Sequence, residues 1–188
     1  MKVLDARRLT GLNLQTEGPA AICEVEFAAD DDVALAEAAW RDAVASLLNL
    51  VGLPERPLTV RYFETSGAWL VEAPIDELYA TVTVNDWACS VAMERLGGEC
   101  ARPINEVAEL VETELEEERD ARLLQVQHEA ALRGVPFLWD DDFVSLGYGK
   151  NCKTWERTSL PEVDALDWSY FGTIPVFLIT GTNGKTTT

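Results

Sequence analysis

Residue types that bind phosphate are concentrated in the last nine residues of the sequence. The segment Thr-Gly-Thr-Asn-Gly-Lys-Thr-Thr-Thr, residues 180–188, follows directly on an apolar run. Gly181 and Gly184 permit a tight turn whose backbone N–H groups point at an anion. Lys185 supplies a positive charge for the β- and γ-phosphates, and the Thr186 hydroxyl is placed to contact Mg²⁺ bound to ATP. The pattern predicts an ATP-binding loop with Lys185 as its catalytic residue, made of Gly181, Thr182, Asn183, Gly184, Lys185, Thr186 and Thr187.

Such a loop works only between a strand and a helix that hold it in shape. Residues 174–179, Ile-Pro-Val-Phe-Leu-Ile, are continuously apolar, which is typical of a strand buried on both faces of a parallel sheet. A helix is expected to start near Lys185, where its N-terminal N–H groups and dipole favour phosphate. The alternative is a chance glycine-rich turn, and the strand context together with Gly-Lys-Thr makes it the weaker interpretation.

The spacing of the loop departs from the general P-loop pattern G-x-x-x-x-G-K-[ST]. That pattern needs glycine at the position of Ile179. The variant Gly-Thr-Asn-Gly-Lys-Thr-Thr, with its apolar lead-in, resembles the loop of the Mur ligase superfamily. This resemblance implies an ATP-dependent ligase that joins a carboxylate to an amine through an acyl phosphate, with ATP and an amino-acid or peptide-like substrate as ligands. Further substrate-binding residues of that superfamily lie beyond such a loop. We therefore expect the 188 residues to be the N-terminal part of a longer enzyme and to be inactive alone.

A second resemblance covers the region before the loop. Residues 131–136, Ala-Leu-Arg-Gly-Val-Pro, residues 145–150, Ser-Leu-Gly-Tyr-Gly-Lys, and residues 8–13, Arg-Leu-Thr-Gly-Leu-Asn, are similar to the N-terminal region of cyanophycin synthetases. In that family an ATP-grasp domain follows the Leu-Gly-Tyr-Gly element, and residues 151–173 leave no room for one. The resemblance therefore implies a cyanophycin-synthetase-like N-terminal domain joined directly to a Mur ligase domain.

Hydrophobic periodicity predicts the elements of that first domain. Strands are expected over residues 2–9, 21–28, 58–64, 68–71 and 143–148, with an extended piece at 135–139. Helices are expected over 33–51, 76–96, from Pro103 onward and over 120–133, with stops at Gly52, Gly97 and Gly134. The strand at 21–28 alternates as a strand buried on one face does, and the strands at 58–64 and 68–71 are expected to form a hairpin. Residues 30–32, all Asp, offer N-caps to the first helix, and Asn85-Asp86 offers a cap for a helix that restarts within 76–96. The predicted fold is α/β overall. It comprises an α+β two-layer domain over 1–157, a connector over 158–173 and the start of the Mur-ligase-type ATP-binding domain over 174–188.

Charge narrows the range of partners. The chain has 15 Lys and Arg against 33 Asp and Glu, a net charge of −18. Such a surface repels nucleic-acid phosphates and anionic lipid heads, so we expect neither nucleic acid nor a membrane as partner. With no signal sequence at the start and no long apolar segment, the expected location is cytoplasmic. An oligomer is compatible with the sequence.

Other candidate residues favour structural roles. The single histidine, His128, is expected on the polar side of a helix, and the four cysteines lack metal-binding spacing, which favours buried or free thiols. The eight carboxylates between 106 and 120 predict either a solvated helix face or, less strongly, a docking face for a cation. Residues 146–150, with Lys150 and Lys153, predict either a glycine-rich hairpin whose Tyr148 packs against Trp155 or, less strongly, a binding groove.

A second function from another class stays open beside the ligase. The N-terminal domain can be a non-catalytic binding or scaffold module for a peptide-like polymer. In that case the 188-residue chain has no activity of its own, whatever the longer enzyme does.

Overall fold

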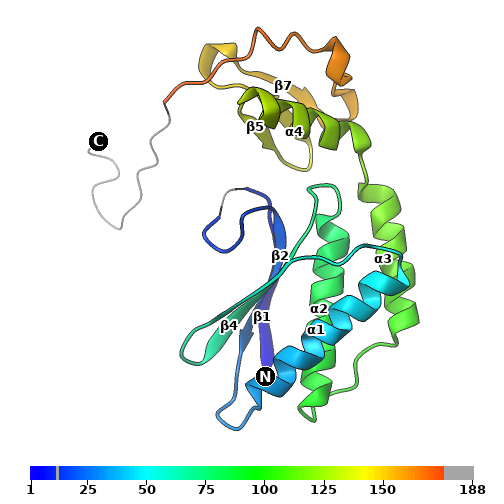
Figure 1. Cartoon of the computed structure of the whole chain (residues 1–188). Helices are drawn as coiled ribbons and strands as arrows, with labels where there is room; N and C mark the ends of the chain where they lie inside the picture. The colour runs from blue at the N-terminus through cyan, green and yellow to red at the C-terminus, as the bar shows by residue number, and fades with distance from the viewer. Residues whose placement is uncertain (12, 176–188) are drawn as a thin grey trace. The chain divides into compact units, whose positions relative to one another are not determined.

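The computed structural model describes residues 1–11 and 13–175. Their contacts divide the chain into two compact units, Met1–Leu124 and the part from Gln125 onward (Figure 1). Helices are combined with two small antiparallel sheets, so the mixed α and β composition that the sequence predicted is confirmed. The strand expected over 174–179 lies almost wholly outside the described residues.

The first unit contains a four-stranded antiparallel sheet. Its strands are β1 (Lys2–Leu9), β2 (Ala20–Glu26), β3 (Leu58–Tyr62) and β4 (Ser66–Glu72), in the order β1-β2-β4-β3. All four predicted strands and the β3–β4 hairpin are confirmed. The expectation that β2 is buried on one face only is wrong for its first half. Because β2 is a central strand, Cys23 and Val25 pack towards the helices while Ala20 and Ile22 join a second apolar cluster with Ala68 and Leu70.

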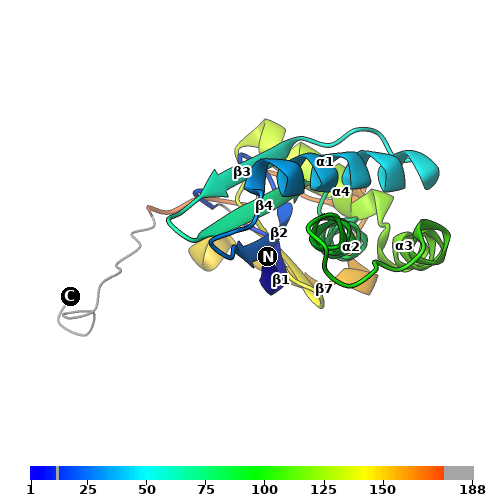
Figure 2. The same cartoon turned by 90° about the horizontal axis from the view of Figure 1, so that it is seen from below.

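Three helices supply the core side of this sheet. They are α1 (Val33–Leu50), α2 (Leu78–Arg95) and α3 (Ile104–Glu118), and Figures 1 and 2 show α1 and α2 against the same face of the strands. The N-terminus of α1 is capped as predicted, since the Asp32 carboxylate accepts a hydrogen bond from the Leu35 N–H at 3.0 Å. Gly52 and Gly97, with φ of 70° and 88°, follow the ends of α1 and α2.

Helix α2 forms despite a run of β-branched residues, Thr81-Val82-Thr83-Val84. It packs against α1, α3 and the sheet, so burial of Ala80, Val84, Ala88 and Ala92 outweighs the modest helix propensity of its sequence. The suggestion that Asn85 and Asp86 cap a restarted helix is wrong, because both lie inside α2.

The second unit is built on a smaller sheet. Helix α4 (Ala121–Arg133) leads to β5 (Phe137–Trp139), β6 (Phe143–Leu146) and β7 (Lys153–Glu156), which pair antiparallel in chain order. Strand β6 ends two residues earlier than expected because Gly147 has a φ of 77°. Strand β7 was not predicted. Short 3-10 turns cover Gly149–Asn151, Arg157–Ser159 and Val163–Ala165.

Residues 158–173, the expected connector, pack within the second unit. Leu160 and Leu166 are buried, and the Phe171 ring lies edge-on to Trp155 at a centroid distance of 6.0 Å and to Trp168 at 5.9 Å. The Tyr148 N–H donates to the Gly172 carbonyl at 2.8 Å. These contacts give the second unit its apolar cluster.

Across the described part of the chain, no helix has the length and apolar character needed to cross a membrane.

Candidate functional site

The predicted ATP-binding residues, Gly181 to Thr187, lie outside the described residues. What the structure does show is the segment that leads to them. Asn151 donates through its amide nitrogen to the Tyr170 carbonyl at 2.7 Å, next to the Tyr148–Gly172 hydrogen bond. The chain a few residues ahead of the predicted loop is therefore held by the glycine-containing element at 147–151.

The glycines of that element serve close backbone packing. A Cβ atom on Gly147 would lie 2.4 Å from the Asn151 carbonyl oxygen and 3.1 Å from that of Gly172. Gly149, with φ of 65°, faces the Ile174 side chain. These contacts agree with the glycine-rich hairpin interpretation. A nearby pocket of about 430 Å³ is lined by Lys153 and Trp155 but by none of residues 146–150; its other lining residues are Pro161, Ala165, Leu166, Asp167, Tyr170 and Phe171.

The histidine and cysteines take no part in a metal site among the residues the structure covers. His128 is exposed on α4, and no group of three or more His, Cys, Asp or Glu side chains there could hold an ion. All four cysteines are free thiols, as expected: Cys23 and Cys89 are buried, Cys152 is half-buried and Cys100 is exposed. Burial raises the pKa of the Cys89 thiol, with the neighbouring Cys23 acting in the same direction.

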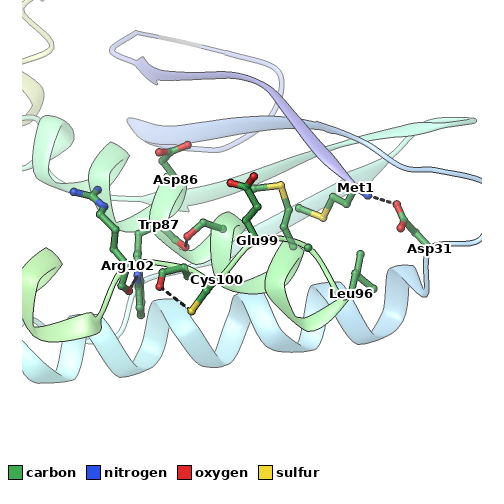
Figure 3. A pocket seen from close by; sticks show the side chains of 13 residues that line it. Met1, Asp31, Asp86, Trp87, Leu96, Glu99, Cys100 and Arg102 are labelled. Carbon is green, nitrogen blue, oxygen red and sulfur yellow. Dashed lines mark hydrogen bonds and ion pairs between the residues drawn. The ribbon is translucent and has the colours of Figure 1, made fainter.

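A cleft of about 570 Å³ lies at the end of α2, against the start of β1 and the loop that leads to α3 (Figure 3). The Trp87 indole N–H donates to the Arg102 carbonyl at 2.9 Å and so holds the ring against this loop. The Glu94 carboxylate accepts from the Ala101 N–H at 3.0 Å, and its hydrogen bond with the Cys100 thiol raises the pKa of that thiol. Sequence patterns did not predict this cleft, because its walls meet only after the sheet and helices pack.

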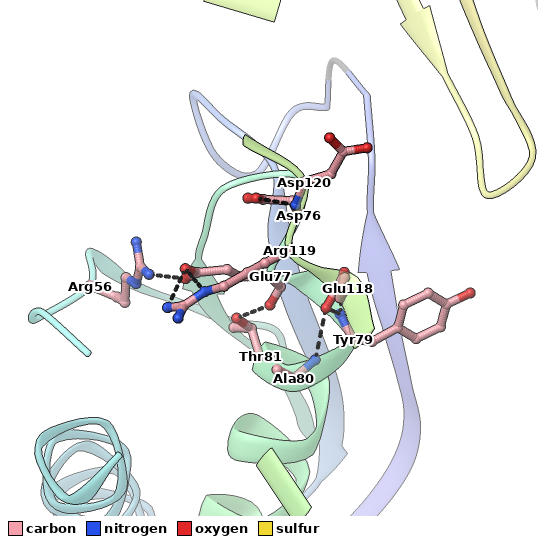
Figure 4. A network of polar contacts seen from close by, with 9 residues as sticks. All are labelled: Arg56, Asp76, Glu77, Tyr79, Ala80, Thr81, Glu118, Arg119 and Asp120. Atoms are coloured by element: carbon pink, nitrogen blue, oxygen red, sulfur yellow. Dashed lines mark hydrogen bonds and ion pairs between the residues drawn. The ribbon is translucent and has the colours of Figure 1, made fainter. Parts of the chain in front are cut away.

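A polar cluster joins the start of α2 to the end of α3 (Figure 4). Glu77, 8% exposed, forms ion pairs with Arg56 and, at 2.9 Å, with Arg119. The Glu118 carboxylate accepts from the backbone N–H groups of Tyr79, at 2.9 Å, and Ala80. Glu118 thus caps α2 from another helix, where the helix dipole favours a negative charge.

Asp76 completes this cluster. Its Oδ2 accepts from the Asp120 N–H at 3.0 Å, while its Oδ1 is buried without a hydrogen-bond partner. Burial raises the pKa of both Asp76 and Glu118, although backbone N–H groups oppose the rise in each case. The cluster therefore fixes where α2 and α4 begin. It was missed because its carboxylates come from two segments that look like ordinary helix ends in the sequence.

Most of the carboxylates between 106 and 120 lie on a solvated helix face, which is the interpretation that the sequence favoured. Glu106, Glu109, Glu112, Glu116 and Glu117 are exposed. Glu114 is half-buried, and its carboxylate accepts from Thr83 Oγ1 at 3.0 Å. Glu118 is the buried exception described above.

A scan of the chain against protein-family models found no match, and a search of curated proteins found none either.

Proposed function

We propose that this chain is the N-terminal part of an ATP-dependent ligase that forms an amide bond between a carboxylate and an amine. The proposal depends on one observation, the sequence Thr-Gly-Thr-Asn-Gly-Lys-Thr-Thr after the apolar run at 174–179. Its donor set fits a magnesium triphosphate: two glycines that free the backbone N–H groups, one lysine and a threonine hydroxyl.

Each residue of the proposed loop has a separate role. The backbone from Thr182 to Lys185 surrounds the phosphates, and Lys185 offsets the negative charge on the transferred group. The Thr186 hydroxyl contacts the magnesium ion, which offsets part of the negative charge of the phosphates. When bound, ATP supplies the phosphoryl group that activates the substrate carboxylate towards the amine.

The described residues contribute an anchor for this loop. Hydrogen bonds from Tyr148 and Asn151 hold residues 170–172, and Gly149 packs on Ile174, where the predicted strand begins. A fixed lead-in reduces the conformational freedom of the segment that carries the loop, which supports a positional role for the second unit.

The test uses the full-length gene product and measures ADP formation with a panel of carboxylates and amines. We expect Lys185→Ala to lower turnover by about two to three orders of magnitude, the usual effect of removing one preorganised charge partner. Lys2→Ala is the matched control, because Lys2 is an exposed lysine on β1, and it should leave turnover unchanged. Near-normal ligation by Lys185→Ala would refute the role of Lys185.

A binding module without catalysis is the second candidate. It is favoured by the cleft of about 570 Å³, which is lined entirely by the first unit and lies apart from residues 180–188 in sequence. Ligand binding at that cleft in a chain that lacks ATP consumption would support this candidate over the first.

A further inference from the structure

A leucine side chain extends into solvent on the loop between β1 and β2. Leu14 is 94% exposed, the highest fraction of any large apolar side chain among residues 1–11 and 13–175. The backbone around it is nevertheless held in place. The Asn13 side-chain oxygen accepts from the N–H groups of Gln15 and Thr16, both at 2.8 Å, and Arg61 of β3 donates to the Leu14 carbonyl at 3.1 Å. The loop therefore holds this side chain outward, and burial against a partner would remove its apolar surface from water.

Leu14 lies at the edge of a hollow of about 370 Å³ on the face of the first sheet opposite α1 and α2. Ile22 and Ala68 of the second apolar cluster form part of its lining, together with Leu4, 49% exposed, and Phe63, 58% exposed. Large apolar side chains that gather on one exposed surface are typical of a contact with another protein. The surface thus offers both a projecting side chain and a hollow.

A second copy of the chain is the partner that this shape fits. Because Leu14 is almost fully exposed, it projects beside the hollow of its own copy and does not fill it. Two copies related by a two-fold axis present the same surface to each other, so each can insert Leu14 into the hollow of the other. The volume of the hollow exceeds that of a leucine side chain.

The distribution of charge favours the same partner. The chain carries a net charge of −18, so most contacts between two copies bring like charges together. The lining of this hollow instead carries one charge of each sign, Arg7 and Glu24, which form an ion pair at 2.6 Å within one copy. Across a two-fold contact Arg7 of one copy can approach Glu24 of the other, so the contact is complementary in charge as well as in shape.

We propose that the chain forms a two-fold homodimer in which Leu14 of each copy occupies the hollow of the other, against Ile22, Phe63 and Ala68. This inference goes beyond the ligase function proposed above and does not depend on it.

The experiment measures sedimentation velocity of the 188-residue chain over a series of concentrations from low to high micromolar. We expect a reversible monomer–dimer equilibrium with a dissociation constant in the micromolar range. Leu14→Ser, which removes the projecting side chain, and Phe63→Ser, which alters the hollow, should each raise that constant at least tenfold. The matched control is Leu132→Ser, because Leu132 is 68% exposed on α4 and does not line the hollow; it should stay within twofold of the parent chain.

An NMR measurement checks which surfaces meet. In a mixture of ¹³C-labelled and unlabelled chains, isotope-filtered spectra should show nuclear Overhauser effects from the Leu14 methyl groups of one copy to the Phe63 ring of the other.

Three results would overturn the inference. A chain that stays monomeric over the whole series would mean that another protein, or another segment of the chain, occupies the hollow. A dimer that Leu14→Ser leaves intact, or that Leu132→Ser weakens equally, would show that the copies meet elsewhere. A dimer without Leu14–Phe63 effects between copies would contradict the proposed insertion. None of these results bears on Lys185, which is tested by ATP consumption.

Discussion

The Trp40 indole N–H donates a 2.8 Å hydrogen bond to the amide oxygen of Asn85, and both residues are fully buried. The Asn85 amide nitrogen donates in turn to the carbonyls of Trp69, at 2.9 Å, and Ala21, at 3.2 Å. One side chain therefore links α1, α2, β2 and β4 and uses three of its hydrogen-bonding positions to do so.

Replacing Asn85 tests this link. Asn85→Ala leaves the buried Trp40 N–H without its partner and removes two hydrogen bonds to strand carbonyls, so we expect the free energy of unfolding of the first unit to fall by about 2–4 kcal/mol. Urea denaturation followed by tryptophan fluorescence measures the change. Ser46→Ala is the control, because this exposed hydroxyl bonds only to the Asp42 carbonyl one helical turn earlier, and its loss should cost less than about 0.5 kcal/mol. A change below 1 kcal/mol for Asn85→Ala would contradict the role assigned to this amide.

The Asn85 cluster also shows where prediction from sequence stops. Strands and helices of the first unit were predicted to within a few residues, because alternation and helical spacing are local properties of the chain. Of the hydrogen-bond partners of Asn85, Trp40 lies 45 residues away in the sequence and Ala21 lies 64 residues away. A polar residue at a helical position was therefore interpreted as a cap, and only packing reveals it as part of the core.

The same reasoning applies to the candidate sites. The loop at 181–187 is recognisable because its residues are contiguous and each type has a phosphate-binding role. The cleft of Figure 3 is assembled from α2 and from the loop that follows it, so no local sequence pattern predicts it. Strand β7 was missed because only Trp155 of its four residues is even partly buried, which leaves no alternation to detect.

Glu77 offers a second test, of the junction between α2 and α3. Glu77→Gln leaves Arg56 and Arg119 facing a neutral amide, and Arg56 is itself largely buried, so we expect a loss of about 2–4 kcal/mol in the free energy of unfolding. The matched control is Glu24→Gln, which removes a surface ion pair with Arg7 and should cost less than about 1 kcal/mol. Similar losses of unfolding free energy in the two variants would show that burial of the Glu77 ion pairs adds nothing to their contribution to stability.

Gly147 and Gly134 form a matched pair for the second unit. Both have positive φ, 77° and 64°, but a Cβ on Gly134 meets open space, whereas on Gly147 it collides with the Asn151 carbonyl. Gly134→Ala should cost about 1–2 kcal/mol from backbone strain alone. Gly147→Ala should cost more, and the amide hydrogen exchange of residues 143–156 should accelerate well beyond the rate in Gly134→Ala. Equal exchange rates in the two variants would mean that the contact with residues 151 and 172 does not stabilise this sheet.

Asp76 gives a prediction about pH. Its pKa lies above the ordinary value of 3.8 in the folded chain, so the fold binds a proton more tightly than the unfolded chain does. Stability from this group is present below pH 3.8 and is lost as the pH rises through the raised pKa. Asp76→Asn keeps an oxygen for the Asp120 N–H and removes the ionisation. The variant should therefore gain stability relative to the parent chain as the pH rises from 4 to 7, measured by urea denaturation at each pH. Glu109→Gln, at an exposed position, should show no such trend. A relative stability of Asp76→Asn that falls over this range would mean that the ionised carboxylate is the form the fold prefers.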